Sequence, residues 1–354
     1  MIDWTLAQRI AGLVAGQPDA PPLRADFVAL AAESQQRVVD FTGLVPRAPL
    51  PAAEGVGRSE WAAANISGMR RMLDPVLERA GGAMRATGPL KPAMQVAAGV
   101  VLTAEVGVLL GFLSQRVLGQ YELVLLEPVA GEDARPPRLL FVEPNLSSAV
   151  RSLGVDEQEF VTWVALHEVT HAVQFGAVPW LQDYLGGLIR ELLAGVELRI
   201  NATRAMRLPS FDDVRRLADA VRQGDLVSLV ARPEERATLD KVQAVMAVIE
   251  GHAEHVMDEV GAGLLPSLPE LRAALDKRRR SASAPARLLG RLLGLEMKMR
   301  QYDAGKRFCD AVARDGGPEA LNRVWSGPES LPTLAELERP AEWLERTRVP
   351  IRTS

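Results

Sequence analysis

The chain has 354 residues, of which 47% are hydrophobic and 24% are charged. These proportions are typical of globular proteins and exclude disorder as the main state, and the length suffices for one large domain or for two of about 150 residues. Lysine and arginine number 41 against 45 acidic residues, a formal net charge of −4, so no overall positive field is available to attract nucleic acid.

The number of cysteines and the N-terminal residues indicate the cellular compartment of the protein. The single cysteine, Cys309, cannot form an internal disulfide or a thiolate-rich metal site, and it is most simply a small buried hydrophobic residue. The pattern of a secretory signal is missing, because Asp3 and Arg9 interrupt the start and the apolar stretch at residues 10–15 is too short. We therefore expect a cytoplasmic protein.

Apolar residues at three- and four-residue spacing dominate the chain and predict helices. The predicted helices cover residues 25–41, 57–80, 92–117, 157–175, 180–206, 237–260 and 286–314. The stretch at residues 93–113 approaches the length of a membrane span, but Gln95, Glu105 and many small residues favour a buried helix of a globular protein. The basic run at residues 277–280 is expected to lie in a solvated loop.

Two apolar runs predict β-strands, one at residues 121–127 and one at residues 138–143. A connector rich in glycine, aspartate and proline joins them, which is typical of a hairpin or a small sheet. We therefore expect a mainly α fold in which a small β-sheet or hairpin precedes the helix at residues 157–175.

The predicted helix at residues 157–175 carries a metal-binding pattern. Its segment LHEVTHAVQF contains HExxH as His167, Glu168 and His171, and Asp156 with Glu159 can cap the start of the helix. Because four residues advance a helix by about 400°, the two imidazoles lie one turn apart on one face, where one metal ion can reach both. Glu168 then lies close enough to hydrogen-bond a metal-bound water without binding the metal itself.

A second segment competes to supply the third ligand. The chain has four histidines, and the two outside HExxH, His252 and His255, both lie in the segment EGHAEHVMD. This clustering indicates a functional site. We favour Glu250 as the ligand, because two histidines and a carboxylate leave a position for water on tetrahedral zinc, and Glu254 could support a ligating histidine. His252 and His255 remain the alternative ligands.

A di-iron centre is the other metal site with a similar helix motif. Glu168 and His171 form the ExxH pattern of di-iron carboxylate bundles, which require a second copy. The residues three positions before His252 and His255 are Ile249 and His252, so the second copy is missing. The sequence therefore disfavours a di-iron oxidase.

Several segments together carry a resemblance. They are DWTLAQRIAG, VVDFTGL, VLGQY, LHEVTHAVQF, EGHAEHVMD, MKMRQYDAGKRFCDAV and NRVWSGPESLPTLAELERPAEW. They resemble a family of zincin-like metallopeptidases of Actinobacteria and Chloroflexi, some members of which carry a label of coenzyme F420 biosynthesis. The resemblance covers most of the chain and implies a mainly helical zincin-like fold, with the metal motif at His167, Glu168 and His171 and an important segment at residues 250–252.

With this resemblance the chain is expected to divide into three regions. They are an N-terminal helical region at residues 1–118, a zincin-like metal-binding core at residues 119–262, and a C-terminal helical region packed on the core at residues 263–354.

The predicted function is hydrolysis that depends on Zn²⁺. Zinc held by the two HExxH histidines and Glu250 activates a water, and Glu168 takes the proton of this water as general base. Tyr302, in the RQYDAG segment, and His252 are candidates to stabilise the oxyanion. A core tyrosine whose hydroxyl is satisfied is the simpler interpretation of Tyr302.

The substrate class is predicted from the small sheet. An edge of the strand at residues 138–143 could pair with an extended peptide, which favours a metallopeptidase. The alternatives are a metal-dependent amidase acting on a small molecule and a catalytically inactive zincin-like scaffold that binds a partner. Glu168 argues against the scaffold, because a structural metal needs no general base. We expect neither nucleic acid nor a membrane as a partner, and the sequence leaves the oligomeric state open.

Overall fold

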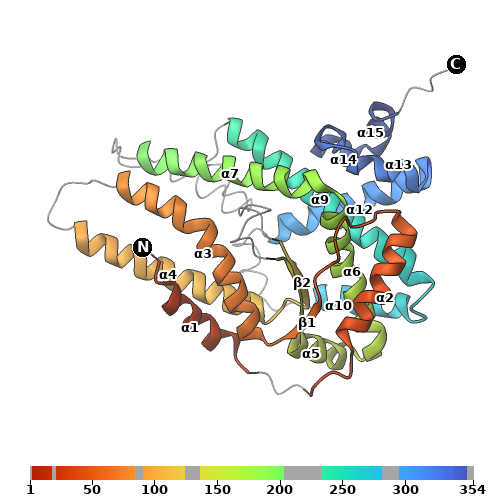
Figure 1. Ribbon diagram of the computed structural model, residues 1–354, viewed down its shortest axis with the longest axis horizontal. Helices are drawn as coiled ribbons and strands as arrows, with labels where there is room; N and C mark the ends of the chain where they lie inside the picture. The colour runs from red at the N-terminus through yellow and green to blue at the C-terminus, as the bar shows by residue number, and fades with distance from the viewer. Residues whose placement is uncertain are drawn as a thin grey trace.

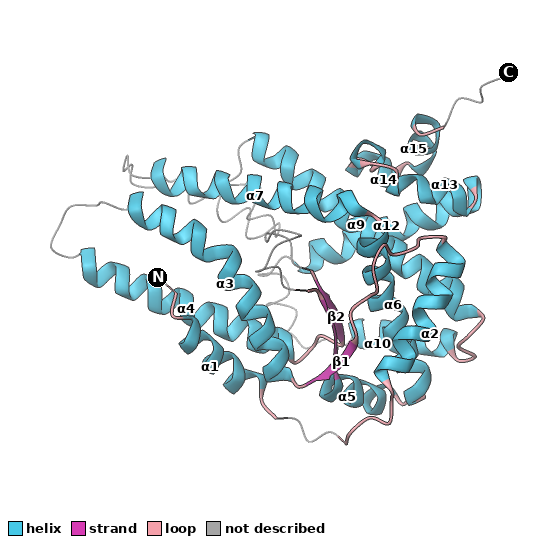
Figure 2. Cartoon of the chain, viewed as in Figure 1, coloured by secondary structure: helices cyan, strands magenta, loops and turns pink. Residues whose placement is uncertain are grey.

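The computed structural model describes residues 2–17, 21–83, 91–123, 136–202, 233–280 and 295–348. These residues form helices for the most part, together with one small sheet (Figure 2). The mainly α fold predicted from the sequence is therefore confirmed.

The first half of the described chain contains both helices and strands. Its elements are α1 (Trp4–Ala15), α2 (Phe27–Thr42), β1 (Ala53–Val56), α3 (Arg58–Ala83), α4 (Lys91–Ser114), β2 (Gly119–Glu122), β3 (Arg138–Val142), α5 (Glu143–Leu153) and α6 (Glu157–Ala177). Helices α1 and α5 were not predicted.

Helices alone make up the second half of the described chain. Its longer helices are α7 (Pro179–Ala202), α9 (Pro233–Ala262), α10 (Leu268–Arg280) and α12 (Leu295–Gly316), followed by the short helices α13 (Pro318–Asn322), α14 (Leu334–Glu338) and α15 (Pro340–Arg346). Each of the seven helices predicted from periodicity corresponds to a helix of the structure, and residues 203–206 and 286–294 of two of these predictions lie outside the described residues. The prediction of a loop at residues 277–280 was wrong, because these residues form the last turn of α10.

The sheet has three strands in the order β1-β3-β2. Strand β3 pairs with β1 in parallel and with β2 in antiparallel orientation. The predicted strand at residues 121–127 is observed as β2, which begins two residues earlier, and residues 124–127 lie outside the described part. Because β3 is the central strand, both its edges are occupied, and the proposal that residues 138–143 offer an edge to a peptide was wrong.

Side chains of β3 enter two hydrophobic cores in alternation. Leu139 and Phe141 pack into a core shared with α2 and α6, whereas Leu140 and Val142 pack into a core shared with α1, α3 and α4. All four are essentially inaccessible to solvent. Figure 1 shows the strands between these two groups of helices. A strand covered on both faces is expected to be a continuous apolar run, as RLLFV is.

Helix α6 runs through the interior of the molecule. The Asp156 carboxylate accepts a hydrogen bond from the Glu159 backbone N–H at 2.9 Å, which caps the first turn as predicted. The Glu159 carboxylate does not complete a capping box and instead accepts from the Ser267 backbone N–H at 3.0 Å. Between Phe160 and Gln174 nearly every residue of α6 is buried, so its polar side chains must find partners inside the protein.

Helices α9 and α12 cross closely at a pair of glycines. A Cβ atom on Gly251 would overlap the backbone of Gly305, and a Cβ atom on Gly305 would overlap the backbone at Ala247. Apolar residues of α7, α9, α12 and α13 to α15 form a third core around this crossing. The close approach fixes α9 at the position where the segment EGH faces α6.

Helix α4 contains the apolar stretch that approaches membrane length. It packs on α1, where Gly107 and Gly111 allow the two backbones to approach. Among the described residues, no helix has the length and apolarity needed to span a membrane. The division of the chain into three regions stays a prediction.

Candidate metal centre

The structure brings three ligand atoms together at the contact between α6 and α9. The Nε2 atoms of His167 and His171 lie 3.2 Å apart. Glu250 Oε2 lies 3.7 Å from His167 Nε2 and 3.6 Å from His171 Nε2. In the described part of the chain, these three residues form the group of histidines, cysteines and carboxylates that could hold a metal ion.

The dimensions of this triangle fit zinc. A tetrahedral zinc ion with bonds of about 2.0 Å holds its donor atoms roughly 3.3 Å apart. The three observed separations lie within about half an ångström of that value. Two imidazoles and one carboxylate are also a donor set of catalytic zinc sites, in which the fourth position stays open. The residues present therefore fit a catalytic zinc ion.

Electrostatics around the triangle favour a cation. Burial alone would lower the pKa of His171, but the nearby carboxylates of Glu250 and Glu168 and a hydrogen bond with Gln174 raise it to about 9. A buried site that stabilises a protonated imidazole has an excess of negative charge. The same excess would be neutralised by a divalent cation.

Glu168 lies beside the triangle and against strand β2. Its Oε2 accepts a hydrogen bond from the Tyr121 backbone N–H at 3.1 Å. Gly119 permits this position, because a Cβ atom there would lie 2.6 Å from Glu168 Cγ. Burial raises the pKa of Glu168 to about 7, opposed by His171 and the Tyr121 N–H and assisted by Glu250. A carboxylate with this pKa exchanges protons readily at neutral pH.

Neither of the alternative histidines reaches the triangle. The His252 Nδ1 atom bonds the Gln174 amide at 2.9 Å, and the ring packs edge-on against Trp325. Burial, with smaller effects of His255 and His171, lowers the pKa of His252 to about 3, so this ring is neutral. The structure therefore brings Glu250, and not His252, to the HExxH histidines.

His255 belongs to a separate chain of ion pairs. Its Nδ1 lies 2.9 Å from Asp310 Oδ1, and Lys306 Nζ bridges Asp310 at 2.6 Å and Asp258 at 3.0 Å. These contacts join α9 to α12. Burial would lower the pKa of Lys306, but its hydrogen bonds with the two aspartates raise it overall. His255 thus contributes to helix packing beside the site.

The predicted roles of Glu254 and Tyr302 stay predictions. His171 has a partner in Gln174, whose Oε1 lies 3.0 Å from His171 Nδ1. The Tyr302 side chain lies outside the described residues, although its backbone belongs to α12. Cys309 is buried, as predicted.

Sequence reasoning missed Gln174, Gly119 and Gly251. Gln174 was detectable, because it lies three residues after His171 and therefore on the same face of the helix. A glycine inside a strand signals the close approach of another group, which applies to Gly119. Gly251 gave no distinct signal, because only its contact with α12 shows why a side chain is excluded.

Comparison with known proteins agrees with this geometry. Residues 2–344 match the family described as zincin-like metallopeptidase, and the chain belongs to this family. The chain is also similar to a protein of Chloroflexus aurantiacus whose crystal structure is described as that of a proposed hydrolase with a novel fold. The two are 31% identical with a TM-score of 0.70, and the match covers 98% of each chain. The comparison with curated proteins gives no match.

The family membership predicted from the segments is thus confirmed. The family description implies a hydrolase of the metallopeptidase type and a metal ion, and His167, His171 and Glu250 could hold one. Neither match names coenzyme F420, so that association stays a prediction.

Proposed function

We propose that this protein is a zinc-dependent peptidase whose zinc ion is held by His167, His171 and Glu250. The observation that carries the proposal is the compact triangle of two imidazole nitrogens and one carboxylate oxygen, with a second, buried carboxylate beside it. A site that held zinc only for structure would have no use for that second carboxylate.

The proposed chemistry divides between the metal and Glu168. When bound, zinc supplies a Lewis acid that polarises a carbonyl group and makes water nucleophilic near neutral pH. Glu168 accepts a proton from the attacking water and passes it to the amine as the C–N bond breaks, so that one amide and one water give one acid and one amine. Its pKa of about 7 suits both steps.

The side of strand β2 that faces away from β3 favours a peptide as the substrate. The Val142 backbone N–H donates to the Leu118 carbonyl, so the backbone groups of alternate residues, Gly119 and Tyr121, point away from β3. The Tyr121 N–H on this side already reaches Glu168. Within the described residues no further strand pairs with this side of β2. An extended peptide bound along it would lie next to the general base.

An oxyanion formed during hydrolysis requires a further donor. His252 is unsuited to this role, because it is buried and its ring packs edge-on against Trp325. Tyr302 remains our proposed donor, on the basis of its position in α12, the helix that packs closely on α9. Replacement of Tyr302 by phenylalanine should lower turnover without loss of zinc.

Metal analysis and peptide hydrolysis test the proposal. We expect about one zinc ion per chain in the purified protein, and loss of zinc after His171→Ala or Glu250→Ala. Peptide-library screening of the zinc-loaded protein, with chelated protein as control, should detect cleavage. Zinc bound equally well after His171→Ala would reject the site. Hydrolysis of small amides without cleavage of any peptide would replace the peptidase by an amidase.

A further inference from the structure

Gln174 makes three hydrogen bonds in a fully buried position. Its side-chain oxygen lies 3.0 Å from His171 Nδ1, and its side-chain nitrogen lies 3.0 Å from the Ile249 carbonyl oxygen and 2.9 Å from His252 Nδ1. The exposed fraction of Gln174 is 0%. One side chain of α6 therefore contacts a candidate ligand on its own helix and two groups of α9.

The Ile249 carbonyl determines how the protons of this cluster are arranged. A backbone carbonyl can only accept, so the amide atom that faces it must be the NH₂ group. The amide oxygen then faces His171, whose Nδ1 must carry a proton in order to donate. The proton-free nitrogen of a neutral His171 is consequently Nε2, which is the atom that belongs to the triangle with His167 and Glu250.

The second hydrogen of the Gln174 NH₂ group determines the protonation of His252. It points at His252 Nδ1, which must therefore accept, so that His252 carries its proton on Nε2. The edge-on contact of this ring with Trp325 and its 1% exposure hold it in place. His252 thus accepts the second hydrogen of an amide whose orientation the Ile249 carbonyl determines.

The contact with Ile249 also bears on the third ligand. Ile249 immediately precedes Glu250. The close crossing of Gly251 with Gly305 fixes the position of this part of α9 against α12. The hydrogen bond from Gln174 to the Ile249 carbonyl ties this turn of α9 to α6. The Glu250 carboxylate oxygen then lies 3.6 Å from His171 Nε2.

We propose that Gln174 is a positioning residue that fixes the proton of His171 on Nδ1 and holds the Glu250 turn of α9 against α6, with the Ile249 carbonyl orienting its amide and His252 as the second acceptor. The inference rests on the proposed zinc site. It assigns a role to each residue of the segment EGH: Glu250 as ligand, Gly251 as the point of close helix contact and His252 as the second acceptor of the amide.

Zinc affinity, measured by competition with a chelator, tests the proposal. Gln174→Met keeps the length of the side chain and removes all three hydrogen bonds, and we expect affinity to fall roughly 10- to 100-fold, as is usual when a partner of a ligating histidine is lost. Gln174→Glu keeps an acceptor for His171 Nδ1, so it should bind zinc more tightly than Gln174→Met. His252→Phe leaves the Ile249 carbonyl as an acceptor and should have the smallest effect.

A second readout separates positioning from a merely structural role. Because the chain has four histidines, nitrogen-15 labelling of histidine gives a spectrum with few signals. In the zinc-loaded protein we expect His171 to carry its proton on Nδ1 and His252 to carry its proton on Nε2. A proton on His252 Nδ1 would overturn the proposed orientation of the amide.

The outcomes also separate this inference from the proposed function. If the unaltered protein fails to bind zinc at the triangle, the proposed function fails. If it binds zinc and Gln174→Met binds zinc equally well, only the role of Gln174 fails. Should Gln174→Met not fold, the spectrum of the unaltered protein still tests the arrangement of protons.

Discussion

Two buried glutamates, Glu168 on α6 and Glu336 on α14, show how differently this molecule uses carboxylates. Each residue is 8% exposed. Burial raises the pKa of Glu168 to about 7. Burial would also raise the pKa of Glu336, but hydrogen bonds from Arg346 and Thr333 lower it overall. Two carboxylates with the same small exposed fraction thus have opposite shifts of the pKa, because Glu168 lies deeper in the protein and Glu336 has an arginine and a threonine as hydrogen-bond donors.

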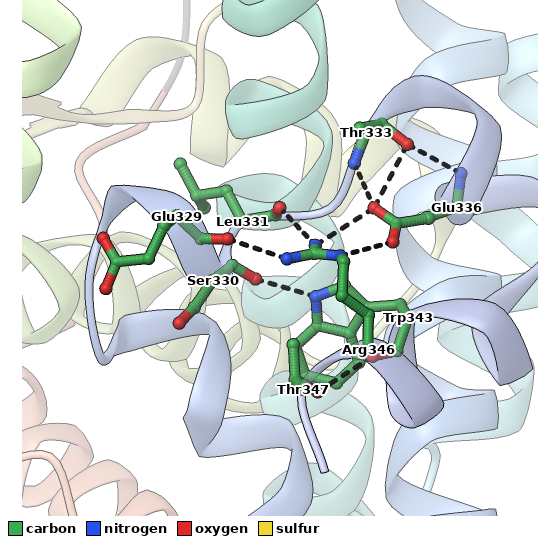
Figure 3. A network of polar contacts seen from close by, with 8 residues as sticks. All are labelled: Glu329, Ser330, Leu331, Thr333, Glu336, Trp343, Arg346 and Thr347. Carbon is green, nitrogen blue, oxygen red and sulfur yellow. Dashed lines mark hydrogen bonds and ion pairs between the residues drawn. The ribbon is translucent and has the colours of Figure 1, made fainter. Parts of the chain in front are cut away.

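The surroundings of Glu336 form a saturated network (Figure 3). Arg346 donates to both oxygens of Glu336, at 2.6 and 3.1 Å, and to the backbone carbonyls of Glu329 and Leu331. Thr333 completes a capping box with the same carboxylate. These bonds hold α14 and α15 together. Glu168, by contrast, accepts one backbone hydrogen bond, from Tyr121. Its two charged neighbours act in opposite directions, because His171 lowers its pKa and Glu250 raises it, and Glu168 can therefore exchange a proton near neutral pH.

Glu168→Gln should give the largest effect. We expect turnover to fall roughly 10²- to 10⁴-fold while the zinc content stays the same, because the amide fills the same space and cannot accept the proton. Metal analysis and initial rates of peptide hydrolysis measure the two quantities. Glu336→Gln is the matched control, for which stability should fall and turnover per folded molecule should persist. Parallel loss of zinc and of turnover in Glu168→Gln would contradict the role of general base.

Gly119→Ala tests whether strand β2 positions Glu168. The added Cβ would lie 2.6 Å from Glu168 Cγ and 3.0 Å from its Cδ, so the carboxylate must move. We expect turnover to fall roughly 10- to 100-fold, because small displacements of a catalytic group are costly. Zinc affinity should change little. Gly187→Ala is the control, since a Cβ there meets no atom within 4 Å and alanine is favoured in a helix. Unchanged turnover in Gly119→Ala would contradict a role of Gly119 in positioning Glu168.

Arg346→Met addresses stability in the C-terminal network. Removal of the guanidinium takes the arginine donor from two backbone carbonyls and leaves the Glu336 carboxylate with Thr333 as its donor. Partial exposure of Arg346 allows water to replace some of the lost bonds. We expect the free energy of unfolding to fall by about 1–3 kcal/mol in urea titrations. Arg314→Met removes only an exposed ion pair with Asp315 and should cause no measurable change. Equal stability of Arg346→Met and the unaltered protein would contradict the saturated network.

The pH dependence of stability should show the smallest effect. Because the pKa of Glu336 is lower in the folded protein than in the unfolded chain, its contribution is present at neutral pH and is lost as the pH falls through the folded pKa. Unfolding free energies measured near neutral pH and near pH of about 4 should therefore differ less in Arg346→Met than in the unaltered protein. An identical difference in both proteins would show that Arg346 does not lower this pKa.

Local signals explain which parts were predictable. Periodicity predicted α6, and the spacing of His167 and His171 placed both rings on one face of it, because these properties depend on residues within a few turns. The cap at Asp156 was predictable for the same reason. Strand β1 was missed, since its four residues AEGV become a strand only by pairing in parallel with β3, more than eighty residues away in the chain.

The amino-acid sequence by itself determined the seven helices that periodicity predicts, the two histidines and the glutamate between them, and it limited the third ligand to a few residues of one helix. Only the tertiary structure decided among Glu250, His252 and His255, because that choice depends on how α9 is rotated and how closely it packs against α6 and α12. It also decided the pKa of Glu168. Burial and neighbouring charges set that value, and both come from segments that are distant in the chain.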